Sequence, residues 1–239
     1  MITVFVVCCT VAFLTGGIPF GYFVGRLVLK DDIRNHGSGN IGATNVGRVL
    51  GWRWGIFVLI LDALKGLMPT LLTSLAANAV LNPGTGAATL SHLPQVSTLF
   101  SPLSAAPEMA NHLTIATGIC AILGHMYPIY LRLRGGKGVA TALGVVLVIA
   151  PWASLSSLAA FALTLAVTRT VALASIAASL IFTVVQLSTL GSNAWTSRYS
   201  TLTLFSIVVP LLIVWRHRSN IVKLLNRPQP QRAGDSQGE

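Results

Sequence analysis

The sequence predicts an all-α polytopic membrane protein with seven transmembrane helices, its N-terminus outside and its C-terminus in the cytoplasm. Of its 239 residues, 53% are hydrophobic and only 9% are charged, whereas soluble domains carry roughly 25% charged residues. The mean hydropathy is +0.73. Apolar runs of roughly 18 residues or more recur along the chain, and such runs can cross a bilayer as helices. This composition excludes an ordinary soluble globular domain.

Lys, Arg and turn residues bound the predicted spans. No Lys or Arg precedes the first apolar run, so a first span with its N-terminus outside fits better than a signal peptide. The region 138–168 admits either one long helix kinked at Pro151 or two short helices that turn there. The predicted spans are 2–25, 54–80, 112–131, 138–150, 152–168, 171–190 and 199–215.

The distribution of basic residues favours seven spans over six. With seven, 14 of the 16 Lys and Arg residues face the cytoplasm, with Arg198 outside and Lys65 within a span. Six spans would leave the last basic cluster outside, against the positive-inside rule. The tryptophans agree in part, because all five lie at predicted span ends, where indole rings favour the head-group layer.

The chain is predicted to form one transmembrane domain over 1–227, followed by a polar, disordered cytoplasmic tail over 228–239. Residues 82–111 are rich in Pro, Gly and Ser and lack Lys and Arg, which predicts an external loop. The three cysteines lie in apolar runs and form no CxxC or Cys/His ligand pattern. The net charge of +10 favours anionic substrates and lipid head groups as neighbours.

The first candidate site is residues 37–48, GSGNIGATNVGR. Its four glycines expose backbone N–H groups, its short polar side chains add hydrogen bonds, and Arg48 adds donors suited to phosphate. The alternative is an interfacial loop whose glycines only form turns. Gly37, Gly39 and Gly42 also satisfy the dinucleotide pattern GxGxxG, but a transmembrane span precedes them where that fold needs a strand.

The second candidate site is the segment Arg134 to Thr141, RGGKGVAT. Glycines and a lysine at a helix start offer N–H groups, the positive end of the helix dipole and an ammonium, which together favour phosphate. It is not a Walker A loop, because Gly138 follows Lys137 where that loop has Ser or Thr. The alternative is a flexible basic anchor.

The third stretch, His217 to Ile221, directly follows the last predicted span, where a basic membrane anchor is the ordinary interpretation. Asp62 and Lys65 are three residues apart on one helical face and can pair. A structural ion pair is the leading interpretation for Asp62, while Lys65 could also face an anion. His125 is more often a packed residue than a catalyst.

Several chemistries are missing from the sequence. It contains no HExxH, no plausible zinc set, no GxSxG and no carboxylate cluster for magnesium or paired acid/base work. Anion binding without a metal, cofactor or covalent nucleophile is therefore predicted, and nucleic acid is not an expected partner.

These stretches together resemble the PlsY family of bacterial glycerol-3-phosphate acyltransferases. SGNIGATNVGR carries most of the resemblance, GGKGVAT and DALKG support it, and HRxN is weak alone. Ser219 replaces a common Glu, Leu133 a common aromatic residue, and the 82–111 segment is longer than expected. The resemblance covers nearly the whole chain in order and spacing.

The resemblance implies transfer of a fatty acyl group from acyl phosphate to the 1-hydroxyl of glycerol 3-phosphate, the first step of phospholipid synthesis. The products are 1-acylglycerol 3-phosphate and phosphate. The expected setting is the cytoplasmic face of the bacterial inner membrane, with membrane lipid but no obligate protein partner. An organic-phosphate transporter and a lipid-binding scaffold are the alternatives.

The resemblance also assigns residues to roles. The general base is either His217 or the donor's own phosphate. The implied catalytic residues are Ser38, Arg48, Lys137, His217 and Asn220. The implied substrate-binding residues are Gly39, Asn40, Gly42, Thr44, Asn45, Lys65, Gly135, Gly136, Gly138 and Thr141.

Overall fold

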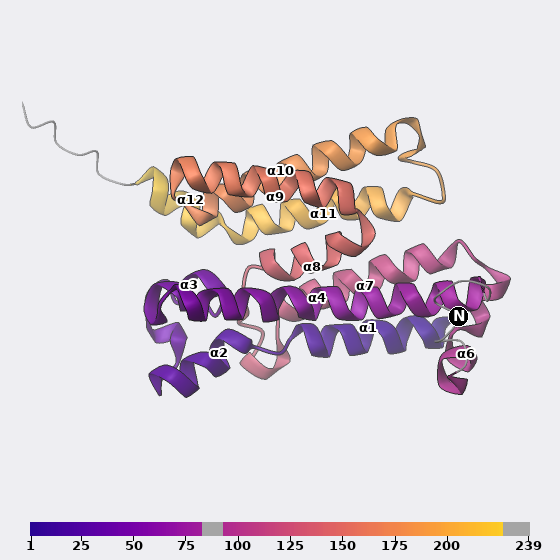
Figure 1. Cartoon of the computed structure of the whole chain (residues 1–239), viewed down its shortest axis with the longest axis horizontal. Coiled ribbons are helices and arrows are strands. Elements are labelled where there is room, and N and C mark those ends of the chain that lie inside the picture. The colour runs from indigo at the N-terminus through magenta and orange to yellow at the C-terminus, as the bar shows by residue number, and fades with distance from the viewer. Residues whose placement is uncertain (83–92, 227–239) are drawn as a thin grey trace, which may run out of the picture.

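The computed structural model describes residues 1–82 and 93–226, and its regular elements in these ranges are helices (Figure 1). The helices are α1 (Ile2–Gly16), α2 (Phe20–Val24), α3 (Ala43–Leu50), α4 (Trp52–Leu81), α6 (Pro94–Phe100), α7 (Met109–Met126), α8 (Val139–Ile149), α9 (Pro151–Thr168), α10 (Val171–Leu190), α11 (Ser200–Arg216) and α12 (Arg218–Leu225). Short π and 3₁₀ turns are Gly25–Leu29, Ile33–Asn35, Ser101–Ala105, Ile129–Leu131 and Gly191–Asn193.

The long helices form two groups with α8 between them (Figure 1). In one group α4 and α7 pack on α1, and in the other α10 packs on both α9 and α11. Helix α8 contacts α4 and α7 on one side and α9 on the other. Helix α8 therefore lies where the two groups meet.

Five of the described helical segments are long and apolar enough to cross a membrane: Ile2–Leu29, Trp52–Leu81, Met109–Leu131, Pro151–Thr168 and Val171–Asn193. This confirms a helical membrane protein. The other two predicted spans are the shorter apolar helices α8 and α11. With 11 residues, α8 is about 16 Å long, against a hydrocarbon core of about 30 Å. The count of seven spans and the sides of the termini remain predictions.

The ambiguous region 138–168 forms two helices. Ala150 leaves the helical region, with φ −151° and ψ 64°, and Pro151 begins α9. Proline suits this first position because it has no amide hydrogen and its φ is already helical. The chain turns back between α8 and α9 (Figure 1).

Glycines let α8 approach α4 closely. A Cβ at Gly66 would overlap the carbonyl of Thr141, and one at Gly144 would overlap the carbonyl of Ala63. Small residues at such crossings are typical of membrane helices. Thr141 is fully buried at this crossing, and among the described residues its hydroxyl has no hydrogen-bond partner. Its contact with substrate remains a prediction.

The predicted loop 82–111 is partly helical. Within it, α6 and the turn Ser101–Ala105 bury Phe100 and Leu103 in one apolar cluster with Val4 of α1. Pro94 at the first position of α6 favours a helix start, and α7 already begins at Met109. Residues 83–92 and the predicted tail 228–239 lie outside the described residues.

Candidate functional site

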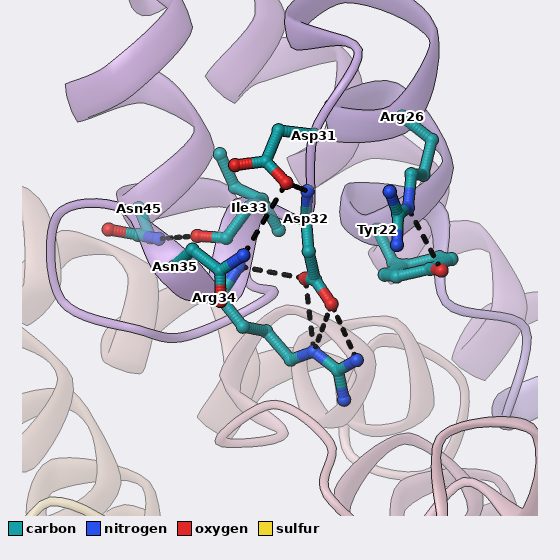
Figure 2. A network of polar contacts seen from close by, with 8 residues as sticks. All are labelled: Tyr22, Arg26, Asp31, Asp32, Ile33, Arg34, Asn35 and Asn45. Atoms are coloured by element: carbon teal, nitrogen blue, oxygen red, sulfur yellow. Dashed lines mark hydrogen bonds and ion pairs between the residues drawn. The ribbon is translucent and has the colours of Figure 1, made fainter.

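A polar network shapes the segment that leads into the first motif (Figure 2). The Asp32 carboxylate accepts hydrogen bonds from the Arg34 backbone N–H and guanidinium, the shortest at 2.6 Å. The Arg34 guanidinium also lies 5.4 Å from the centre of the Tyr22 ring. Hydrogen bonding from Arg34 holds the pKa of Asp32 below its ordinary value. The network is therefore charged at neutral pH and closes a tight turn.

Asn45 joins this turn to the first motif. The two hydrogens of its side-chain Nδ2 are shared among three backbone carbonyls, those of Ile33 at 3.2 Å, His36 at 3.0 Å and Asn40 at 2.8 Å. Its Oδ1 accepts from the Ser38 N–H at 2.7 Å and from the Ser38 hydroxyl at 3.0 Å. Asn45 is 1% exposed. Its amide is occupied by the protein, so it supports the loop instead of contacting substrate.

The loop that Asn45 holds presents its other polar groups outward. Gly37 and Gly39 have φ of +61° and +72°, a left-handed backbone that favours glycine. Ser38 and Gly39 are exposed in the loop, and Thr44 and Arg48 are exposed on α3.

Asn40 and Gly42 serve the turn between these exposed groups. The Asn40 side-chain oxygen accepts the N–H of Gly42 at 2.8 Å. That N–H is consequently committed to the turn, not offered to an anion as the sequence analysis expected.

The second motif forms a strap between α7 and α8. The N–H groups of Gly135 and Gly136 donate to the carbonyls of Met126 and His125 at 3.2 and 3.1 Å. These two amides were predicted to bind phosphate, but they join the strap to α7 instead. Gly138 has φ +84° and precedes α8, which begins without a side-chain cap. The first turn of α8 therefore supplies the N–H groups and positive dipole end suited to an anion.

His217 connects the third motif to the second. Its Nδ1 lies 2.8 Å from the carbonyl of Ile213 and must donate to it, which leaves Nε2 as an acceptor. The ring is buried, and this burial together with the positive charges of Lys137 and Arg216 lowers the pKa of His217 to about 4. His217 is thus neutral near pH 7, and Lys137 lies close enough to act on it.

Replacement of His217 by Gln should change the pH dependence of stability. Because the pKa of His217 is about 4 in the folded protein and about 6.5 when unfolded, its protonation destabilises the fold as pH falls from about 6.5 to 4. We therefore expect the free energy of unfolding of the wild type, measured by thermal unfolding, to fall relative to that of His217→Gln. The relative loss should be about 2 kcal/mol as the pH falls over this window. The control is His112→Gln, whose ring contacts Thr201 on α11. A difference in unfolding free energy between the wild type and His217→Gln that does not change with pH would contradict a buried, neutral His217.

Lys65 lies inside the bundle instead of at the predicted anion site. Its ammonium is 2.9 Å from Asp62 Oδ1 and donates to the carbonyl of Ile18, at the break between α1 and α2, at 2.8 Å. Both ionic side chains are buried, and His125 Nδ1 lies 3.7 Å from the same carboxylate oxygen. The structure supports the interpretation of Asp62 as one member of a structural ion pair and extends it to Lys65.

The described contacts join the second and third motifs. Helix α3, which carries the end of the first motif, lies at the same end of the molecule as α12, which carries most of the third (Figure 1). Asn220 is half-buried one helical turn after His217.

Sequence reasoning missed Arg216, whose guanidinium donates to the carbonyls of Gly135 and Gly136. Its place directly before His217 was the available signal, but a basic residue ending a span is ordinarily a membrane anchor.

Residues 6–227 match the family model described as glycerol-3-phosphate acyltransferase. The chain belongs to this family. A glycerol-3-phosphate acyltransferase of Myxococcus xanthus is 37% identical over 91% of the chain and 94% of its own length. That of Pseudomonas savastanoi is also 37% identical, over 94% and 96%.

Solved structures agree with the sequence relatives. A crystal structure of PlsY, an integral membrane glycerol 3-phosphate acyltransferase, in the glycerol 3-phosphate form has a TM-score of 0.70 at 32% identity and covers 92% of each chain. The lysophosphatidic acid form has a TM-score of 0.67 at the same identity, covering 92% of this chain and 91% of that one. The resemblance to PlsY and the predicted acyltransferase activity are confirmed.

Proposed function

We propose that this acyltransferase uses acyl phosphate as donor and acylates the 1-hydroxyl of glycerol 3-phosphate at the cytoplasmic face of the bacterial inner membrane. The observation that carries this proposal is an apolar cavity of about 150 Å³ that begins at Val139 and Ala140, the first residues of α8. Phosphate-binding groups thus stand directly beside a space for hydrocarbon. The PlsY structures in the glycerol 3-phosphate and lysophosphatidic acid forms are consistent with such a pair of subsites.

The cavity wall suits an acyl chain. It extends between α8, α10 and α11 and reaches Phe182 and Phe205. The hydroxyls of Ser157, Ser175 and Ser179 face backbone carbonyls as hydrogen-bond donors, so these serines add little polarity to the wall. Burial of each methylene contributes about 0.8 kcal/mol to binding.

The reaction needs no covalent enzyme intermediate. The 1-hydroxyl oxygen attacks the acyl carbonyl carbon, a C–O bond forms, and the bond from that carbon to the phosphate oxygen breaks. The hydroxyl proton passes to the departing phosphate, which leaves as inorganic phosphate. Because its pKa is about 4, His217 is a weak base at neutral pH, and its Nε2 is better suited to orient the hydroxyl.

The remaining polar residues position the substrates and stabilise charge. Lys137 and the first turn of α8 bind one phosphate, and Arg48 stabilises the negative charge that develops during attack. The Ser38 hydroxyl, which donates to Asn45 in this structure, turns away from it to donate to the substrate. Asn220 orients the acceptor beside His217. Positioning and charge stabilisation of this kind can supply most of the rate for an already activated donor.

The proposed arrangement has seven spans in one domain over 1–227, with the N-terminus outside, the C-terminus in the cytoplasm and no obligate protein partner. The charge distribution supports it, since 14 of the 16 Lys and Arg residues then face the cytoplasm.

Purified protein in detergent, supplied with acyl phosphate and glycerol 3-phosphate without divalent metal, tests the reaction. We expect equal release of inorganic phosphate and lysophosphatidate. A folded sample that forms neither product would contradict the proposal. Uptake of glycerol 3-phosphate into liposomes carrying that sample would then indicate the transporter alternative.

Gly136→Ala should weaken acceptor binding. The added methyl group would overlap the His125 imidazole, which lies against Gly136. The strap must then move, and with it the start of α8. We expect the Michaelis constant for glycerol 3-phosphate to rise about tenfold, measured by product release at saturating donor. An unchanged constant would mean that the strap does not position the acceptor.

A further inference from the structure

The strap formed by Gly135 and Gly136 is held from two sides by groups distant in sequence. On the α7 side, its amides donate to the carbonyls of Met126 and His125. On the α11 side, a single nitrogen, Nη2 of Arg216, donates to Gly135 O at 3.1 Å and to Gly136 O at 2.6 Å. Three consecutive peptide planes, from residue 134 to residue 137, are thereby fixed.

The direction of the last of these planes determines what the strap presents to the site. A trans peptide is planar, with its C=O and N–H pointing in opposite directions. Since Gly136 O points to Arg216, the N–H of Lys137 points away from it. Glycine resists rotation of its flanking peptides less than any other residue. Without an external bond, this plane would have little to hold it.

Arg216 is itself held in place for this contact. Its guanidinium lies 5.4 Å from the centre of the Tyr127 ring, and its backbone ends α11 directly before His217. Arg218 shows the contrasting behaviour of a membrane anchor. It is exposed, and its guanidinium lies 4.2 Å from the centre of the Trp215 ring.

We infer that Arg216 is a positioning residue of the acyltransfer reaction, which sets the Gly136–Lys137 peptide and so the placement of Lys137 and the first turn of α8. This inference rests on the proposed function, because these groups are the ones that bind phosphate there. In the described ranges, the Arg216 guanidinium donates its hydrogen bonds to the strap carbonyls, and it acts through the residues that they orient. It also ties the second motif to the third, across 80 residues of sequence.

Arg216→Ala is tested against Arg218→Ala, which removes the same charge two residues away without touching the strap. We expect kcat/KM of Arg216→Ala to fall about 10²-fold, the scale of a misplacement of about 1 Å. Hydrogen–deuterium exchange should become faster in residues 134–140. Arg218→Ala should stay within about twofold of wild type in both measurements. Equal kinetics for the two variants, or a loss in Arg216→Ala without faster exchange, would overturn the inference.

Arg216→Lys separates position from charge and serves if the alanine variant does not fold. It keeps the charge on a shorter side chain that reaches the strap less well. We expect an intermediate loss of about tenfold in kcat/KM, with faster exchange in 134–140. Wild-type rate and exchange in this variant would show that charge alone suffices and would overturn the positioning role. Exchange needs no turnover, so it tests the strap even if acyl phosphate proves not to be the donor.

Discussion

Arg48→Ala should lower turnover by about 10²–10³, the scale seen when a preorganised donor is removed from a site that stabilises developing charge. Arg48 is exposed on α3, which Asn45 anchors to the preceding turn. The side chain buries little surface, so thermal stability should change little. Release of phosphate and lysophosphatidate at saturating substrate measures the effect.

Arg53→Ala is the matched control for Arg48→Ala. Arg53 is also exposed, lies five residues further along at the start of α4, and stacks on Trp52. It has the same charge at the same end of the bundle. Near-normal turnover in Arg48→Ala, or equal losses in the two variants, would remove Arg48 from the reaction.

Asn45→Asp should disable the first motif without altering any group that faces the site. The substitution replaces the Nδ2 donor with a carboxylate oxygen that faces the carbonyls of Ile33, His36 and Asn40. Both side-chain N–H donors are lost, and acceptors are left facing one another in a buried place. We expect the unfolding free energy to fall by about 2–4 kcal/mol and activity by about 10² or more.

Asn35→Asp controls for the same chemical change outside the buried network. Asn35 is exposed, and its side chain makes one long hydrogen bond to Asp31, at 3.4 Å. Its replacement should shift the thermal midpoint by little. If Asn45→Asp behaved like Asn35→Asp in both assays, the buried amide would not be what holds the loop.

Much of the fold follows from local sequence. Hydrophobic length predicts α4, α9, α10 and α11 to within about two residues, because a bilayer requires apolar runs of a given length with satisfied backbone hydrogen bonds. It does not predict the break in the first span, where α1 ends at Gly16 and α2 begins at Phe20. The ambiguity at Pro151 could not be resolved this way, since proline can either kink a helix or begin one. The helical structure of 93–105 was missed because its burial of Phe100 and Leu103 depends on contacts with distant helices.

The sequence by itself determined that this protein is a helical membrane acyltransferase and which three segments carry its polar chemistry, because motif residues and apolar lengths are properties of the chain. Only the tertiary structure decided how those residues divide their work. Asn45 and Lys65 are occupied by the protein, while Arg216 reaches the strap. The same polar side chain can either hold a site in place or contact the substrate. Which of the two it does depends on the long-range partners that the fold brings within hydrogen-bonding distance.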